Sequence, residues 1–412
     1  MNRMHWPLAV LLCWLPLAGA GSEAENASVE ALIEALQSKD LPARRNAAYD
    51  LDQLGRQAAP AVAALMVALD DADQQVWSRS ASALAGIGPS AEPAISKLVA
   101  GLSDGGQRAY RYGYALSQIG PAALPVLLET LQAEQPPARG GAARSLGWMG
   151  PPAGSAVPAL LELLDDAEAT VAVLSAEALG RIGHVAPLVA ALAHESPARR
   201  RGAAAALGHM ANPSLDALEP LLKATQDADA TVRGQALLTV GTFGEATIPH
   251  LPQLVAAVAD TQANVRAAAV TALTQARPHS LPAVALLIPH LSQERPEVVL
   301  SAARALGRFG AAAKDAIPAL IATLTTLDPP ADDTTLPRTF RRIGPESIAP
   351  LAKLLQSDSP RLLKMAATCL ERFGPGAAVA LPALETHREH ADPAVSTAVQ
   401  TAIAKIAPSP LK

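Results

Sequence analysis

The segment VRGQALLTVGTFG at residues 232–244 decides the fold, because close copies of it return along most of the chain. The clearest copies are ARGGAARSLGWMG (138–150), VAVLSAEALGRIG (171–183) and VVLSAARALGRFG (298–310). With the opening residue as position 0, the closing position 12 falls at residues 55, 88, 120, 150, 183, 211, 244, 277, 310, 344, 374 and 407. A period of about 32 residues over almost the whole chain predicts a solenoid, in which each unit buries its apolar face against its neighbours.

The columns of this alignment indicate what each unit is made of. Apolar or small residues recur at positions 0, 4, 7, 8 and 11, which is the pattern of one helix face. Position 12 is Gly in nine of the twelve copies, and we expect it to stop the helix in the left-handed αL conformation. A proline a few residues later opens a second helix, as in PALLELLDD (158–166) and PLAKLLQSD (350–358). Each unit is therefore predicted to be a pair of helices.

The recurring A-x-x-A-L-G-x-I-G pattern, the Gly-Pro stop and the Pro-led partner helix resemble the short HEAT-like repeats of phycobilisome lyase subunits and related proteins. The resemblance covers roughly residues 27–408. It implies an all-α fold, a right-handed αα-superhelix of the HEAT/armadillo type with about twelve two-helix repeats. Since such repeats serve scaffolds, adaptors and a few enzymes alike, the resemblance carries little about function.

The beginning of the chain indicates export. Arg3 precedes an apolar run, PLAVLLCWLPLAGA (7–20), which ends in a small-x-small cleavage site and is too short to span a bilayer. We therefore expect a signal peptide at 1–20, a short linker at 21–26, the solenoid at 27–408 and a tail at 409–412. Cys13 lacks the preceding small residue that a lipoprotein signal needs. The expected location of the mature protein is the periplasm or the exterior of the cell.

One repeat departs from the pattern. Repeat 10 reads TTLDPPADDTTLPRTFRRIG (325–344). Its position 5 is Pro337, whereas in the other copies position 5 is expected to lie inside the helix. Because proline breaks a helix interior, we expect this helix to start near Pro337, with Thr334 or Thr335 at its cap, and an irregular seam at 325–337.

The residues that could carry catalysis are few. His194-Glu195 is similar to the dyads of deoxyhypusine-type hydroxylases, but those enzymes need four dyads and this chain has one. His387 and His390 have a spacing that could hold zinc with Glu389, and Cys369 stands at a core position. Each has a plainer structural interpretation. The sequence predicts no catalytic residue, no metal site and no cofactor.

The outward columns of the second helix point instead to binding. In proteins with the HEAT-like pattern this helix lines a concave surface, and positions 2, 3, 6, 9 and 10 face away from the core. These columns hold fourteen basic and three acidic residues, although position 10 also favours cations through the helix dipole. Exposed Tyr and Trp beside Arg are typical of binding hot spots. The candidate partner-binding residues are Tyr49, Arg79, Tyr110, Arg111, Tyr114, Arg144 and Trp148.

The sequence therefore favours a non-catalytic scaffold or adaptor of the cell envelope that binds a protein partner. Two alternatives stay open at this point. One is a receptor for an anionic polymer such as an acidic glycan, and the other is a metal-dependent oxidoreductase or a lyase of the HEAT-like family. No nucleic-acid partner and no transmembrane segment in the mature chain are expected.

The N-terminal expectation is directly testable. If residues 1–20 are removed during export, intact-mass measurement of protein purified from its native envelope will show a chain that begins at Gly21. A lipid adduct on Cys13 would contradict this prediction.

Overall fold

The computed structural model describes residues 28–327 and 333–407. Within these residues every regular element is a helix and there is no strand. The all-α repeat fold predicted from the sequence is therefore confirmed. The expected signal peptide, the whole linker, the tail and the centre of the seam lie outside the described residues.

The chain divides into two compact units, residues 1–87 and residues 88–412. In the first unit the described helices form two pairs. They are α1 (Val29–Leu36), α2 (Leu41–Leu54), α3 (Val62–Ala68) and α4 (Gln74–Ile87).

The second unit holds the remaining ten helix pairs of the described residues. They are α5 (Ile95–Ala100), α6 (Gly106–Ile119), α7 (Leu124–Thr130), α8 (Pro136–Met149), α9 (Val157–Glu162), α10 (Ala169–Ile182), α11 (Val185–Ala191), α12 (Pro197–Gly208), α13 (Leu218–Ala224), α14 (Ala230–Val240), α15 (Leu251–Ala256), α16 (Ala263–Gln275), α17 (Ala283–Leu287), α18 (Pro296–Phe309), α19 (Ile317–Thr326), α20 (Thr335–Ile343), α21 (Ile348–Leu354), α22 (Pro360–Glu371), α23 (Leu381–Glu385) and α24 (Pro393–Ile406).

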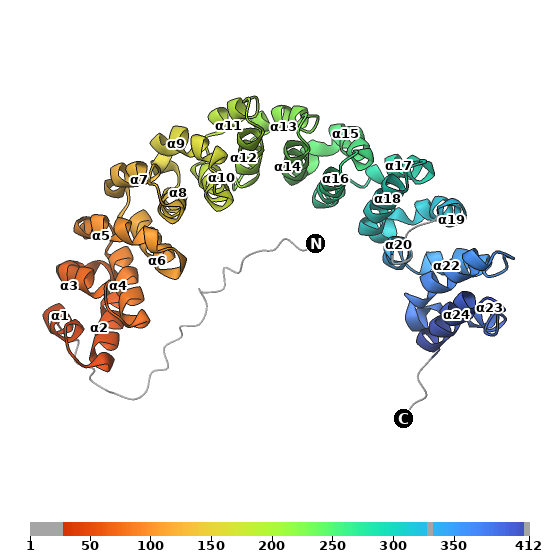
Figure 1. Cartoon of the computed structure of the whole chain (residues 1–412), viewed down its shortest axis with the longest axis horizontal. Coiled ribbons are helices and arrows are strands. Elements are labelled where there is room, and N and C mark those ends of the chain that lie inside the picture. Colours follow the sequence, from red (N-terminus) through yellow and green to blue (C-terminus); the bar gives the residue numbers. More distant parts are fainter. Residues whose placement is uncertain (1–27, 328–332, 408–412) are drawn as a thin grey trace. The chain divides into compact units, whose positions relative to one another are not determined.

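Within each unit the helices are arranged in two layers. Odd-numbered helices are the first helices of the repeats, and even-numbered helices are the second. Successive second helices contact each other, as α8 contacts α10 and α18 contacts α20, and each also packs on its own first helix. Figure 1 shows this within the second unit, where α13 and α15 lie in one row and their partners α14 and α16 in the other.

The core lies between the two layers, where the predicted apolar columns meet. Every residue at position 8 is buried, from Leu51 and Leu84 in the first unit to Phe340 and Ile403 in the second. Position 11 is also largely buried, as at Ile182. Complete burial of a leucine side chain contributes about 1.5–3 kcal/mol. Each repeat therefore gains its stability from the repeat before it and the repeat after it.

The glycine at position 12 ends the second helix, but not in the way that we expected. All nine such glycines have a positive φ angle, which side chains disfavour. Gly183 adopts the left-handed helical conformation, with φ 80° and ψ 19°. Gly150, at φ 70° and ψ −142°, is in the mirror image of the extended region, as are several of the others. That region is essentially restricted to glycine, so the requirement for this residue is stricter than an αL cap would make it.

The prolines lie where the sequence places them. Pro158, Pro252, Pro318 and Pro382 are each the second residue of a first helix, where the missing N–H breaks no hydrogen bond. At the seam, Thr334 is the N-cap of α20, and Pro337 is in its first turn, as predicted. Residues 328–332 lie outside the described residues, so the irregular conformation expected at the centre of the seam stays a prediction.

A row of arginine–aspartate pairs joins successive repeats. The arginine at position 1 binds an aspartate in the inter-helix turn of the next repeat, 27 residues later, through its Nε–H and Nη2–H groups. For Arg139 the distances are 2.7 Å from Nε and 2.8 Å from Nη2 to the carboxylate of Asp166. Its remaining nitrogen donates to the carbonyls of Ala133 and Glu134, in the turn of its own repeat. One side chain thus fastens two consecutive inter-helix turns.

The same arrangement recurs in four places and then stops. The pairs are Arg44–Asp71, Arg139–Asp166, Arg200–Asp227 and Arg233–Asp260. Arg266 keeps the two carbonyl contacts to its own turn. The residue that would offer its carboxylate is Gln293, and the row ends there.

The resemblance to HEAT-like repeats implies that an arginine at position 1 binds the aspartate three residues before position 0, here Asp40, Asp73 or Asp229, but this pairing is wrong. Instead, these aspartates cap the second helices: Asp40 accepts from the N–H of Ala43, and Asp229 from those of Thr231 and Val232. Asp73 in addition binds Arg45, and this hydrogen bond lowers its pKa to about 2. The residue two positions earlier is the one that lies within reach of the preceding repeat.

The arginine–aspartate pairs are partly shielded from water, so each contributes more to stability than an exposed ion pair does. The side chain of Asp166 is 5% exposed and that of Arg139 is 16% exposed. Hydrogen bonding from Arg139 holds the pKa of Asp166 below its ordinary value. Hydrogen bonds to charged groups contribute about 1.5–3 kcal/mol each, well above the value of a fully exposed ion pair.

None of the helices in residues 28–327 and 333–407 combines the length and the hydropathy needed to span a bilayer.

Truncation of one core leucine should loosen only its neighbourhood. Leu179 on α10 is buried, so Leu179→Ala should cost about 2–5 kcal/mol. Val173→Ala is the matched control, because Val173 is on the same helix and is exposed. Hydrogen exchange should accelerate in α8, α10 and α12 for the first variant and nowhere for the second. Uniform acceleration over all repeats would contradict the account of the fold.

Removal of one aspartate should give a pH-dependent loss of stability. Asp166→Asn should cost about 1–3 kcal/mol at pH 7, because it leaves Arg139 without its carboxylate. Since the folded pKa of Asp166 is lowered, the contribution is complete above the ordinary aspartate pKa of about 4 and is lost as the pH falls through the folded value.

Urea unfolding at pH 7 and pH 3 measures this difference. The difference in the free energy of unfolding between the parent and the Asp166→Asn variant should be smaller at pH 3 than at pH 7. Glu162→Gln in the same repeat removes an exposed carboxylate and serves as the control, with no change expected at either pH. A gap of equal size at both pH values would show that the ionised pair is not the cause.

Candidate partner-binding surface

The second helices α6 and α8 bring three aromatic side chains and one arginine together. Tyr110 and Tyr114 are one turn apart on α6, and Arg144 and Trp148 are one turn apart on α8. The ring centres of Tyr110 and Trp148 are 4.9 Å apart, and those of Tyr114 and Trp148 are 5.9 Å apart, both with an interplanar angle of 78°. Such edge-to-face contacts are the favoured geometry for aromatic pairs. We call these four residues the aromatic–arginine cluster.

A glycine makes the cluster possible. Gly113 lies between the two tyrosines on the side of α6 that packs on α8. A Cβ atom at this position would lie 2.7 Å from the hydroxyl of Ser145 and 3.5 Å from the ring of Trp148. Because there is no such atom, α8 can approach closely enough for the Trp148 ring to reach the edges of both tyrosines.

The cluster is separate from the core of its repeats. Tyr110 and Tyr114 remain 50% and 46% exposed, whereas Tyr112 on the same helix is 3% exposed. A Cβ atom on Gly101 would clash with the Tyr112 ring, which shows how tightly that ring is enclosed. The sequence predicts that positions 2 and 6 face outward and that position 4 faces the core, and the burial of Tyr112 at position 4 and the exposure of Tyr110 and Tyr114 at positions 2 and 6 confirm this. Their role in binding is a separate question.

Arg144 contributes a positive charge that no acid in the described residues neutralises. Its guanidinium carbon lies 5.8 Å from the centre of the Tyr110 ring and 6.0 Å from that of Trp148. These are cation–π distances. Within residues 28–327 and 333–407, Arg144 forms no ion pair of 4 Å or less. Arg111, between the tyrosines on α6, is exposed and also forms no ion pair in this part of the chain.

An apolar cleft of about 390 Å³ adjoins the cluster at Arg144. It lies between the beginnings of α6, α8 and α10, and its walls include Gly106, Pro137, Gly140 and Leu174. The sequence analysis did not identify this cleft. The sequence feature that could have indicated the cleft is the run of small residues and prolines at 104–106 and 136–141, because larger side chains there would fill the space.

Tyr49 and Arg79 form a group of their own in the first unit. The Arg79 guanidinium lies 5.0 Å from the centre of the Tyr49 ring, and Tyr49 is 47% exposed. Unlike Arg144, Arg79 is neutralised, since its Nη1 atom lies 2.9 Å from the carboxylate of Asp52. The two groups of predicted residues therefore differ in charge.

The excess of basic residues in the outward columns is partly cancelled by ion pairs. Arg45 pairs with Asp73, Arg79 with Asp52, and Lys405 with Glu371. The acids that neutralise Arg79 and Lys405 stand at position 9 of the preceding repeat. Counting columns could not show this, because the pairs join residues from two different repeats.

The residues that could have indicated a metal or a nucleophile are engaged in local contacts. The Nε2 atom of His387 lies 2.7 Å from the carbonyl of Leu355, and Nδ1 of His390 accepts from the N–H of Asp392. His194 accepts from the N–H of Ser196 in the same way. Burial raises the pKa of the Cys369 thiol. Among the described residues no group of three or more His, Cys, Asp or Glu could hold a metal ion.

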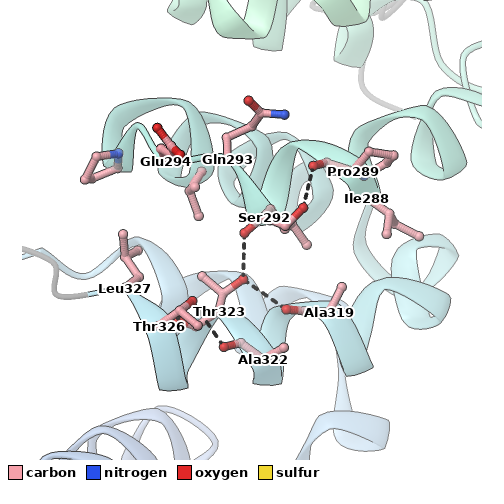
Figure 2. Close-up of a pocket in the computed structure, with 13 residues that line it drawn as sticks. Ile288, Pro289, Ser292, Gln293, Glu294, Ala319, Ala322, Thr323, Thr326 and Leu327 are labelled. Atoms are coloured by element: carbon pink, nitrogen blue, oxygen red, sulfur yellow. Dashed lines mark hydrogen bonds between the residues drawn. The ribbon is translucent and has the colours of Figure 1, made fainter.

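A second cleft, of about 590 Å³, lies between the first helices of repeats 9 and 10 (Figure 2). The hydroxyl of Thr323 lies 2.9 Å from the carbonyl of Ala319, and that of Ser292 lies 3.0 Å from the carbonyl of Pro289. Of the described residues that line this cleft, Glu294 is the only charged one. Its walls therefore offer no acid–base pair.

Comparison with protein families identifies one match. The family model described as HEAT repeats matches residues 107–180, 185–258 and 251–333, which together make up more than half of the chain. Comparison with curated protein sequences gave no match.

Similar solved structures include an engineered protein, the karyopherin Kap121p and Kap95p. The engineered protein is 21% identical, with a TM-score of 0.35, over 92% of this chain and 98% of that one. The karyopherin Kap121p, bound to the extreme C-terminus of the protein phosphatase Cdc14p, is 16% identical with a TM-score of 0.49. Kap95p, in a structure with RanGDP, is 13% identical with a TM-score of 0.49. This chain spans 45% and 62% of the last two, and values this low support no inference about function.

Proposed function

Because the chain belongs to the HEAT-repeat family, we propose that it is a non-catalytic scaffold of the cell envelope that binds a protein partner through the aromatic–arginine cluster. The observation that carries this proposal is the contact of the exposed Tyr110 and Tyr114 with the half-buried Trp148, beside Arg144, which forms no ion pair in the described part of the chain.

The residue types and their arrangement support a protein partner. Tyr, Trp and Arg dominate the energetics of protein interfaces. Tyr and Trp cover a large area with few rotatable bonds, and Arg adds a planar, charged guanidinium group that donates several hydrogen bonds. In this cluster the rings already hold one another in place, so less conformational freedom is lost when a partner covers them. The adjoining apolar cleft could accept an aliphatic side chain of the same partner.

A structural role for the cluster explains less. If these aromatic residues filled gaps in an alanine-rich core, they would be enclosed, as Tyr112 and Trp77 are. Tyr110 and Tyr114 instead leave about half of their surface in water. Exposed aromatic surface of this kind is unusual unless a ligand covers it.

The location in the cell envelope is part of the proposal and rests on the segment 1–20 alone. The non-catalytic role is supported by the local engagement of His194, His387 and His390 and by the burial of Cys369.

The proposal predicts a large loss of affinity without a loss of fold. A partner is first captured from the native envelope with the full chain, and its affinity is then measured by biolayer interferometry. Tyr110→Ala combined with Tyr114→Ala should weaken binding by about 2 kcal/mol or more, which is roughly thirty-fold. The free energy of unfolding should change by less than about 1 kcal/mol, since neither ring is in the core.

Two further variants sharpen the test. Val67→Ala combined with Val379→Ala removes exposed apolar surface elsewhere and should leave the affinity within twofold. Arg111→Glu combined with Arg144→Glu should slow association and change its dependence on salt. If the double tyrosine variant bound its partner as tightly as the parent, the cluster would not be the binding site.

A further inference from the structure

A second group of arginines that form no ion pair within the described residues lies on α18 and α20, in repeats 9 and 10. Arg304 and Arg308 are one turn apart on α18, and Arg338 and Arg342 are one turn apart on α20. All four are exposed at positions 6 and 10 of their repeats. We call them the four-arginine cluster.

The packing of the two helices places these arginines close together. Gly307 lets α20 approach, since a Cβ atom there would lie 3.0 Å from the Cα atom of Thr339. The hydroxyl of Thr339 donates to the carbonyl of Ala303 at 2.9 Å. Ala303 precedes Arg304, and Thr339 follows Arg338. The two helices are thus in register, with the arginines of one beside the arginines of the other.

The cluster lacks the acids that neutralise cations elsewhere in the outward columns. Arg79 and Lys405 are paired with acids at position 9 of the preceding repeat, Asp52 and Glu371. In repeats 8 and 9, which precede the repeats of the four arginines, position 9 is Thr274 and Gly307. Within residues 28–327 and 333–407, none of the four arginines has a carboxylate within 4 Å. Arg308 and Arg304 reach only the hydroxyls of Thr274 and Thr335, at 3.5 Å and 3.4 Å.

The charges in the cluster repel one another. Burial, followed by the charges of Arg342 and Arg304, lowers the pKa of the Arg308 guanidinium. The C-terminal end of a helix favours one cation in its last turn, which accounts for Arg308 and Arg342 separately. It does not account for Arg304 and Arg338, which lie one turn earlier. A negatively charged partner would relieve the repulsion.

We propose that the four-arginine cluster binds a short acidic segment of a protein, with each guanidinium facing a carboxylate. This inference rests on the proposed function, since it assigns a second contact to the same protein-binding scaffold. Planar guanidinium groups match carboxylates through two parallel hydrogen bonds.

Spacing and net charge favour a short peptide over a long polyanion. Carboxylates on one face of an extended peptide recur about every 6.5–7 Å, close to the roughly 5–6 Å between side chains one turn apart on a helix. The whole chain carries a net charge of −5, so a long polyanion would meet repulsion beyond the cluster. A short segment is influenced only by charges within the screening length of about 8–10 Å.

Fluorescence anisotropy with a labelled hexaglutamate peptide and the full chain tests this proposal. Arg304→Gln combined with Arg342→Gln should weaken binding at least tenfold. Arg181→Gln combined with Arg201→Gln is the matched control, because it removes two exposed arginines of the second helices outside the cluster and changes the net charge equally. This control should change the affinity less than twofold. Arg342→Gln alone, with an expected loss of threefold or more, gives the answer if the double variant does not fold.

The competing ligands give the remaining outcomes. Hexagalacturonate, an acidic glycan with the same number of carboxylates, and inorganic phosphate should each bind at least tenfold more weakly than hexaglutamate. Tighter binding of the glycan, equal losses in both pairs of variants, or no binding of hexaglutamate would overturn the proposal. If these results coincided with a loss of partner affinity on removal of Tyr110 and Tyr114, the proposed function would stand and only the acidic segment would be wrong.

Discussion

The fold depends on the burial of two apolar columns of the second helices, at positions 8 and 11, between the two helix layers of consecutive repeats. A single helix pair cannot cover its own leucines at position 8, so each repeat requires its neighbours. The other contacts between repeats determine how closely consecutive repeats approach each other. Small residues such as Gly113 and Gly307 allow contact between backbones, the position-12 glycines reverse the chain, and the Arg–Asp pairs fix one inter-helix turn against the next. Because all of these contacts face along the array or inward, the outer face of the second helices remains available for other uses.

Most of this fold could be predicted from the sequence, because it depends on periodicity and on local chemistry. The burial of Leu179, the first-turn position of Pro158 and the N-cap at Thr334 all follow from residues within one repeat. What could not be predicted depends on geometry between repeats. Asp166 rather than an aspartate at position −3 meets Arg139, because the partner comes from the next repeat. The conformation of Gly150 likewise follows from how the chain must enter the next helix, and the identity of the residue does not reveal it.

The candidate surface shows the same division. Helical angles predicted correctly that Tyr110 and Tyr114 face outward and that Tyr112 faces the core. They could not predict that Trp148 lies against both tyrosines, or that Arg79 is neutralised while Arg144 is not, because these facts require the register of two helices. The four-arginine cluster is a further instance. In the sequence its arginines are simply members of the basic columns. They differ from the other cations only once those that pair with Asp52, Asp73 and Glu371 in the structure are excluded.

The central claim is that this chain works through exposed side chains on its second helices, and hydroxyl-radical footprinting tests it most directly. In the free protein, Tyr110 and Tyr114 should be oxidised readily, the half-buried Trp148 at an intermediate rate, and Tyr112 and Trp77 slowly, in keeping with their burial. In the complex with the captured partner, oxidation of Tyr110, Tyr114 and Trp148 should fall several-fold, and that of the two buried residues should stay unchanged. Equal oxidation of Tyr110, Tyr114 and Trp148 in the free and bound protein would contradict the account.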